Sequence, residues 1–539
     1  MLPAYALALS LLVAGPLLGP GYLLLRDAVS TPRSYLTDAA LGLSEAAPRA
    51  LPQDFFVAVT SSVLDGGLVV KFLLVAGLML AGWGAARLAA TVLGSALPGQ
   101  FIAATLAIWN PYVAERLLQG HWSLLIGYGA LPWVAVCVLR LRTDPGLGPV
   151  WGLLFWTALA GLTPTGLMLA ATVALVCVAA PGHGWGRARV AALGLGTAMA
   201  AATPWLMAAA IGDSATSPDP GAGVHAFAAR AEPGLATLGS LAGLGGIWNG
   251  QAVPHSRTTL FAVVATVALL GIVALGLPVL LRNRVAVPLL VLSAAAVLIP
   301  AAMATGPGLA FVEAAIRAVP GLGVVRDGQK WVALAMPGYA LAAAAAPDTL
   351  RRLRIPAAAA ATVSCAALIA VLPDLAWGVG NQMRAVQYPG SWTAAAAQIN
   401  ADPRPVTVLP PDSMRDFSWT PTGPVLDPLP RWLRAEVLIT GDLSIGGQTV
   451  PGEGAHARAV QDLVLSGATD QRLAEAGVGW VVHESDHQVT VHRVGGTAPA
   501  STRRGVMIAA HLVWLAVLAG GAAGMAVSFW RARRSSGQI

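Results

Sequence analysis

Charged residues are scarce in this 539-residue chain: Asp, Glu, Lys and Arg make up 11% of it, whereas 56% is hydrophobic. A soluble protein of this length needs far more polar surface, so a soluble fold is excluded. We expect a mainly α-helical, polytopic membrane protein. The formal net charge of +7 also raises nucleic acid or anionic lipid as partners. The arginines stand in short clusters between apolar runs, however, which is the ordinary topology signal of a membrane protein, so no nucleic-acid binding is expected.

Cysteine and lysine are nearly missing. The three cysteines, Cys137, Cys177 and Cys365, fall inside apolar runs, so neither a disulfide framework nor a cysteine-based metal site is expected in the loops. The sequence has no D-x-D or cysteine-pair motif, and no glycine-rich phosphate loop between a strand and a helix. A metal site built by the protein and cytoplasmic nucleotide chemistry are therefore not expected. The only lysines are Lys71 and Lys330, at the ends of apolar runs.

Apolar runs of about 20 residues, the length that crosses the hydrocarbon core, recur along the chain. They predict about 12 transmembrane helices, near 2–25, 68–88, 98–112, 122–139, 149–163, 165–181, 188–210, 258–281, 285–303, 330–346, 355–373 and 504–530. If the N-terminus is cytoplasmic, every inner loop holds an arginine near a span end, as the positive-inside rule requires. We therefore expect both termini to be cytoplasmic.

Three regions follow from this topology. Residues 1–373 form the transmembrane part, residues 374–503 an extracytoplasmic domain, and residues 504–539 a last span with a basic cytoplasmic tail. The outer domain has strand-like runs at 405–410, 435–440, 479–485 and 487–494, with a helical stretch at 455–476. Strands mixed with a helix predict a small α/β or α+β fold, which about 130 residues are enough to build.

The first outer loop, residues 26–67, opens with an adjacent cation and anion, Arg26 and Asp27. A carboxylate half-buried at the membrane boundary is expected to have a raised pKa, which suits a general base that deprotonates a hydroxyl group. Arg26 would hold Asp27 ionised or contact a phosphate. Asp38 and Asp54 are fallback candidates for the base. The alternative is that the Arg26–Asp27 pair only anchors a helix end at the interface.

A second candidate segment is VVRDGQKW, residues 324–331, at the expected outer mouth of a span. Arg326 and Lys330 together suit a phosphate or pyrophosphate, Arg through paired hydrogen bonds and Lys as a point charge. The alternative is that both side chains only snorkel to the interface. Lys71, at the expected outer start of the second span, is a further candidate for substrate binding.

A third candidate segment is NPYVAERLLQGHW, residues 110–122, in which Asn-Pro interrupts a span. The residues that follow are expected to bring Glu115, Arg116 and His121 to the outer surface. His121 and Arg116 are candidates for contacts with a sugar or a phosphate. The alternative is that His121 packs beside Trp122 at the membrane interface.

Together these features resemble the GT-C superfamily of membrane glycosyltransferases, and above all its actinobacterial and YfhO-like members. The shared features are a charged first outer loop, many spans, an outer C-terminal domain and the NPY…ERLLQGHW segment. The phrases that echo the family are FAARAEPGLATLGSLAGLGGIWN (227–249), VVRDGQKW (324–331), YPGSW (388–392) and DLSIGGQTVPGE (442–453). The resemblance covers most of the chain.

In that superfamily the sugar donor is a polyprenyl phosphate presented at the outer leaflet. An acidic residue of the first outer loop is the usual base, and basic residues at outer span ends hold the lipid phosphate. The resemblance therefore implies Asp27 as the base and Arg326 and Lys330, with Arg26, at the donor phosphate. This chain departs from many members, which have two adjacent acidic residues where it has Arg26 and Asp27.

The function expected is transfer of a sugar, arabinofuranose or mannose, from a polyprenyl-phosphate donor to a cell-envelope glycan or lipoglycan. It would take place on the outer face of the plasma membrane of an actinobacterium. The resemblance implies no certain cofactor, and leaves open a divalent cation bound through the donor phosphate. Two alternatives remain: a non-catalytic envelope scaffold that binds glycan, and a transporter for a lipid-linked saccharide. A transporter would carry ionisable residues near the bilayer midplane, whereas here they gather at span ends.

Overall fold

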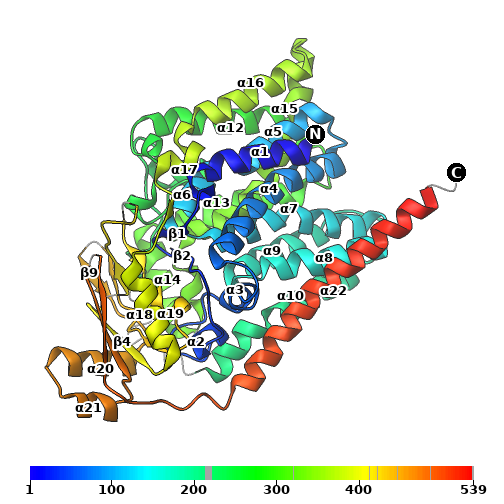
Figure 1. The fold of residues 1–539 in the computed structure, drawn as a ribbon. Coiled ribbons are helices and arrows are strands. Elements are labelled where there is room, and N and C mark those ends of the chain that lie inside the picture. Colours follow the sequence, from blue (N-terminus) through cyan, green and yellow to red (C-terminus); the bar gives the residue numbers. More distant parts are fainter. Residues whose placement is uncertain are drawn as a thin grey trace.

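The structure is a computed structural model that describes residues 1–539 except 213–220, 222, 320, 412, 422, 446, 486 and 537–539. Apolar helices make up most of it, and the strands gather at one end (Figure 1). Both termini lie at the ends of their helices that point away from the strands (Figure 1). The molecule thus has a helical part and a strand-rich part at one end of it.

Five helices are long and apolar enough to cross a membrane. They are α4 (Gly66–Leu93), α7 (Trp122–Thr143), α10 (Arg187–Ile211), α12 (Phe261–Leu280) and α22 (Arg504–Ser536). Helix α7 is central, because 89% of its apolar window is buried, whereas α22 is peripheral at 28%. Helix α22 packs along α8 (Leu147–Ala160), where the Trp514 indole donates a hydrogen bond to the Ala158 carbonyl.

Two bent helix pairs raise the number of candidate spans to seven at most among the described residues. Helices α13 (Val287–Met303) and α14 (Gly306–Ala318) meet at 92°, and α16 (Ala357–Ala370) meets the segment Pro373–Asn381 at 73°. Three shorter apolar helices occupy Leu2–Leu18, Leu147–Ala160 and Pro164–Val178. A multispan helical membrane fold is confirmed, but the twelve spans expected from the sequence are not, because several apolar runs form helices too short to cross alone.

The first expected span, 2–25, is the clearest correction. Helix α1 covers Leu2–Ala14, a 3₁₀ turn follows over Gly15–Leu18, and Tyr22–Leu25 is strand β1. Glycine and proline at 15–16 and 19–21 break the helix, since proline lacks the amide hydrogen and glycine disfavours helix. Gly21 has φ +119°, and a Cβ there would lie 2.5 Å from the Val386 carbonyl oxygen. The chain therefore leaves the helical part as a strand.

The strand-rich part is built on a four-stranded sheet in the order β11-β10-β4-β7. Strand β10 (Trp480–Glu484) pairs in parallel with β4 (Val406–Leu409) and antiparallel with β11 (Val489–Arg493), and β7 (Val437–Leu438) runs parallel to β4. Helices α18 (Gly390–Ala401), α20 (Ala455–Leu465) and α21 (Asp470–Glu475) accompany the sheet. All four strand-like runs predicted from the sequence form strands, and the predicted helical stretch forms α20 and α21.

The first loop is bound to the strand-rich part by main-chain pairing and an ion pair, and to the start of α22 by a second ion pair. Strand β1 pairs antiparallel with both β2 (Ala28–Val29) and β3 (Ala385–Val386). Arg431 of the strand-rich part forms an ion pair with Asp54 at 3.2 Å, and Arg504, the first residue of α22, forms one with Asp38. Segments more than 350 residues apart in the chain thus hold the first loop in place.

Candidate functional site

Asp27 sits in the tight turn between β1 and β2, fixed by main-chain hydrogen bonds on three sides. The Arg26 amide donates to the Pro424 carbonyl at 2.8 Å, the Leu426 amide donates to the Arg26 carbonyl at 2.9 Å, and the Asp27 amide donates to the Gln119 carbonyl at 3.2 Å. Arg26 has a left-handed backbone with φ +50°. This strained conformation in an ordered turn is typical of positions that a function requires.

The close approach of another loop depends on Gly120. Gly120 ends helix α6 (Pro111–Gln119) with φ +87°, and a Cβ there would lie 2.3 Å from the Ala28 nitrogen. No side chain fits in that space, so glycine lets the end of α6 lie directly against the Asp27 turn. The residues on either side of Gly120 then reach the Asp27 carboxylate.

One oxygen of the Asp27 carboxylate is held and the other is open. Oδ2 lies 3.0 Å from His121 Nε2 and accepts a hydrogen bond from Gln119 Nε2 at 3.1 Å. Among the described residues, Oδ1 has no hydrogen-bond partner, and the side chain is 41% exposed. The carboxylate is thus oriented by the protein and still accessible.

The tautomer of His121 follows from its second neighbour, Arg116. His121 Nδ1 lies 3.1 Å from Arg116 Nη1. A guanidinium only donates, so Nδ1 must accept, and the proton of the neutral ring is on Nε2. His121 therefore donates to Asp27 and orients it, and does not itself act as a base in this arrangement.

Arg116 is anchored by a buried ion pair. Its Nη1 and Nη2 donate to the two oxygens of Asp327 at 2.8 and 3.0 Å, and Nη2 also donates to Gln329. The Arg116 side chain is fully buried and that of Asp327 is 7% exposed. This paired geometry locks the guanidinium that holds His121.

Glu115 extends the same network to the loop after α11 (Ala236–Ala242). Its carboxylate accepts from Gln329 Nε2 at 3.0 Å and from the amides of Gly246 and Ile247, each at 3.1 Å. Glu115 and Arg116 are both fully buried, so the expectation that they reach the outer surface is wrong. Arg116 positions other groups, and its burial does not fit the direct substrate contact expected from the sequence.

Lys330 stands beside this cluster. The Asp327 carboxylate caps the 3₁₀ segment Gly328–Ala335 by accepting from the Lys330 amide at 3.3 Å, and it lies 3.8 Å from Lys330 Nζ. The Lys330 side chain is 26% exposed. Arg326 is half-buried and lies over the Phe227 ring, 5.2 Å from its centroid. Both cations expected at a phosphate are thus partly exposed, and Lys330 is the one that acts on Asp27.

The electrostatics of Asp27 differ from the expectation. Burial raises the pKa of its carboxyl, but the hydrogen bonds from His121 and Gln119 and the Lys330 charge outweigh it, so the pKa lies below its ordinary value. The raised pKa expected from the sequence is therefore wrong. Burial lowers the pKa of His121, so its ring is neutral at pH 7. Asp27 is an ionised carboxylate over the whole physiological range.

Four sequence candidates have other partners. Arg26 is buried and donates to the carbonyls of Leu118 and Gln251, each at 2.6 Å, which does not fit a phosphate contact. Lys71 is buried and donates to the Gly19 carbonyl at 2.6 Å, which does not fit substrate binding. The fallback carboxylates Asp38 and Asp54 pair with Arg504 and Arg431.

The sequence reading missed three polar partners of the site: Gln119, Asp327 and Gln329. Gln119 and Gln329 are uncharged, so no charge pattern in the sequence indicates them. Asp327 lies between Arg326 and Lys330, which were the residues predicted to bind a phosphate. In the described part of the chain, no group of three or more His, Cys, Asp or Glu residues is placed to hold a metal ion.

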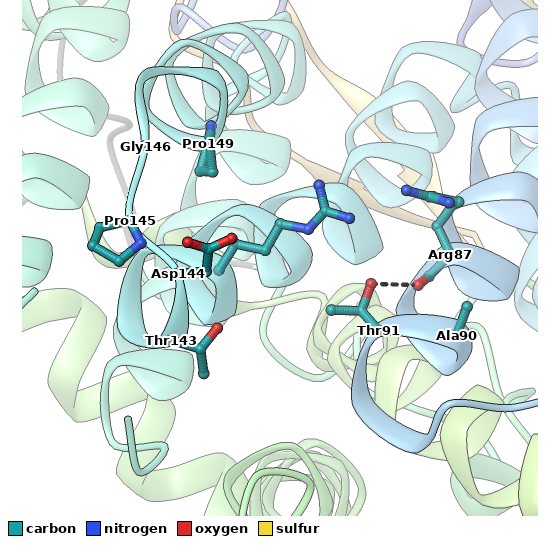
Figure 2. A pocket seen from close by; sticks show the side chains of 9 residues that line it. Arg87, Ala90, Thr91, Thr143, Asp144, Pro145, Gly146 and Pro149 are labelled. Carbon is teal, nitrogen blue, oxygen red and sulfur yellow. Dashed lines mark hydrogen bonds between the residues drawn. The ribbon is translucent and has the colours of Figure 1, made fainter. Parts of the chain in front are cut away.

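A separate cavity lies at the other end of the helices. It is lined by Arg87 and Thr91 near the end of α4 and by residues at the end of α7, with Asp144 and Pro149 (Figure 2). At 1.5 Å per residue, Arg87 lies about 30 Å along α4 from the end that faces the Asp27 turn. This cavity shares no residue with the Asp27 cluster and is not part of that site.

Two solved structures share this fold: two classes of a mutant of the arabinofuranosyltransferase AftD from mycobacteria, determined by cryo-EM. They align with TM-scores of 0.56 and 0.53 at 18% and 17% sequence identity, each over 90% of this chain. The chain spans 37% and 36% of the length of those proteins. No protein-family model and no curated protein matches the sequence. The chain therefore shares the fold of these arabinofuranosyltransferase structures, which agrees with the fold expected from the resemblance.

Proposed function

We propose that this chain is a membrane glycosyltransferase that uses a polyprenyl-phosphate sugar, with Asp27 as its general base. The observation that carries the proposal is the Asp27 carboxylate, which His121 and Gln119 hold by one oxygen while the other oxygen is open. A base must be fixed, ionised and accessible to a hydroxyl group, and Asp27 meets all three conditions. It does so in a fold shared with a glycosyltransferase.

The proposed reaction needs one proton acceptor and one site for negative charge. Asp27 Oδ1 takes the proton of the acceptor hydroxyl as its oxygen bonds to the anomeric carbon of the donor sugar. The bond from that carbon to the phosphate oxygen breaks, and its electron pair leaves with the polyprenyl phosphate. Lys330 and Arg326 stabilise the charge that develops on the phosphate. His121 and Arg116 act by positioning Asp27.

Apolar side chains surround one side of Arg326. They belong to the loop before α11 and to α13, α14 and the bend between them, namely Val224, Ala228, Ala229, Pro300, Met303, Ala304, Leu309 and Val312. The cavity among them, about 10 Å³, holds no more than one water molecule, so an isoprene unit has no room in it. The support for a phosphate-bearing donor is therefore the pair of partly exposed cations, Lys330 and Arg326.

The neighbour structures favour arabinofuranose over mannose as the sugar, since AftD is an arabinofuranosyltransferase. We propose a cell-envelope glycan as the acceptor and a site on the outer face of the plasma membrane, with both termini cytoplasmic. Two observations support this orientation. The first and last helices end on the side away from the strand-rich part (Figure 1). Arg87 and Arg140 line the cavity at that opposite end.

Sugar transfer by the purified protein tests the proposal. The donors are radiolabelled polyprenyl-phosphate arabinofuranose and mannose, the acceptors are short envelope glycans, and each reaction is run with and without a chelator of divalent cations. Transfer from the arabinofuranose donor is the expected result. Intact protein that binds the glycan but transfers neither sugar would overturn the enzyme and favour the scaffold. Donor movement across vesicle membranes without transfer would favour the transporter.

A further inference from the structure

A third cation near the proposed donor site is tied to the outer domain. Arg49, in the first loop, places Nη2 2.5 Å from Oε1 of Glu453, which precedes α20. The Arg49 side chain is 58% exposed, whereas that of Glu453 is only 13% exposed. Nearby, the Glu45 carboxylate accepts from the amide of His456 at 3.1 Å at the start of α20. The loop therefore meets the outer domain through two separate carboxylate contacts.

Arg49 belongs to the same electrostatic region as the two cations of the proposed donor site. Burial is the largest cause that lowers the pKa of Arg326 and of Lys330, and the charge of Arg49 lowers both pKa values further. The Glu453 charge acts on Arg326 in the opposite direction. The segment that carries Glu453 also reaches the surroundings of Arg326: a Cβ on Gly223 would lie 3.0 Å from Phe227, the ring beside Arg326, and 3.3 Å from Val450, three residues before Glu453. Asp327 and Asp27 are the carboxylates that act on Lys330, so Glu453 is the carboxylate on the side of Arg326 and Arg49.

We propose that Arg49 is a third phosphate-binding residue of the donor site and that Glu453 occupies it until the donor phosphate displaces the carboxylate. This inference rests on the proposed function. A guanidinium pairs with carboxylate and phosphate oxygens in the same way, so one anion can replace the other without a change in the arginine. The exchange releases one tie between the first loop and the outer domain, while the Glu45 tie remains.

The proposal predicts opposite effects for the two partners of one ion pair. Glu453→Gln removes the competitor and should tighten binding of the donor by about three- to tenfold, whereas Arg49→Gln should weaken it by a similar factor. Both variants break the same ion pair, so any loss of structure is common to them and cannot produce opposite signs. Glu45→Gln breaks the neighbouring tie and should leave donor binding unchanged.

The measurement is the Kd of the purified full chain for a sugar-free polyprenyl phosphate, followed by the KM for the sugar donor. Opposite shifts for Glu453→Gln and Arg49→Gln, with Glu45→Gln like wild type, are the expected result. Equal weakening by both variants, no shift in either, or tighter binding by Glu45→Gln would overturn the inference while the function stands. Wild-type protein that neither binds the lipid phosphate nor transfers sugar would instead overturn the proposed function.

Discussion

Two buried arginine–carboxylate clusters of this molecule behave in opposite ways. Beside the candidate site, Arg116 faces Asp327 in a paired geometry, and the pKa of Asp327 falls to about 2, because Arg116 and Lys330 outweigh the effect of burial. In the outer domain, Arg415 lies 2.6 Å from Glu484 and 3.6 Å from Asp427. There burial and the neighbouring Asp427 raise the pKa of Glu484 to about 8.

The difference comes from the number of cations for each carboxylate. Both oxygens of Asp327 accept hydrogen bonds from Arg116, whereas Glu484 Oε1 has no partner among the described residues. One guanidinium shared by two carboxylates cannot offset the free energy of burying both as anions. Protonation of a carboxylate is therefore favoured over its ionised form. The site cluster is therefore a fixed charge pair, and the outer-domain cluster is a proton-binding one.

Removal of the site arginine should have the largest effect. Arg116→Met leaves Asp327 buried without its cation and should lower the free energy of unfolding by about 3–5 kcal/mol. A thermal melt in detergent measures the loss. Arg351→Gln is the control, since Arg351 and Asp348 form an exposed pair that contributes at most about 1 kcal/mol. If Arg116→Met had the same melting temperature as the control, the burial of Asp327 would not depend on its ion pair with Arg116.

Removal of the outer-domain arginine should cost less. In Arg415→Met the two carboxylates can take up protons. At pH 6 the free energy of unfolding should therefore fall by only about 1–3 kcal/mol, which is typical of a buried polar group that loses its hydrogen bond. The loss should grow as the pH rises, because the carboxylates then ionise without a partner. Melts at pH 6 and pH 8 measure this. A loss at pH 6 larger than that of Arg116→Met would reverse the comparison.

The pH dependence of stability should have opposite signs in the two clusters. Because the folded pKa of Glu484 is raised to about 8, its contribution is fully present below its ordinary pKa near 4.5 and is lost as the pH rises towards 8. Glu484→Gln should flatten this decline, which amounts to about 3–4 kcal/mol between pH 5 and pH 8, and should come close to wild type at pH 5. Asp327, with its lowered pKa, should lose its contribution only as the pH falls from 4 towards 2. An equal pH dependence in wild type and Glu484→Gln would contradict the raised pKa.

The smallest predicted effect concerns His121. His121→Ala removes the hydrogen bond that lowers the pKa of Asp27, so the acid limb of kcat/KM should move to higher pH by about 0.5–1 unit. His492→Ala, an exposed histidine paired with Asp470, is the matched control. An acid limb that stays in place would show that His121 does not set the protonation of Asp27.

The parts of the fold that depend on local patterns could be predicted from the sequence. Runs such as 479–485 and 487–494 are rich in valine, which favours strands, and both form strands of the sheet. The apolar runs mark the helices correctly, but apolar length alone does not tell a span from a short buried helix. The prediction of the first span was wrong for this reason, since Leu23, Leu24 and Leu25 are buried in a strand and do not face lipid.

The candidate site could be predicted only in part, because its partners come from distant segments. Asp27 meets His121 across 94 positions and Arg116 meets Asp327 across 211. A charge at the end of an apolar run is compatible with an exposed catalytic group or a buried structural one. Asp27 is accessible and the adjacent Arg26 is buried, and no local pattern distinguishes the two. The lowered pKa of Asp27 likewise depends on neighbours that only the fold brings near.

The most direct test of the central claim compares sugar transfer by wild type and Asp27→Asn, with Asp38→Asn and Asp54→Asn as matched controls. Asp27→Asn keeps the shape of the side chain and removes the proton acceptor, which should lower kcat about 10²- to 10⁴-fold. The two controls should keep most of their activity, because those carboxylates pair with Arg504 and Arg431. A folded Asp27→Asn protein that transfers sugar at the wild-type rate would contradict Asp27 as the base.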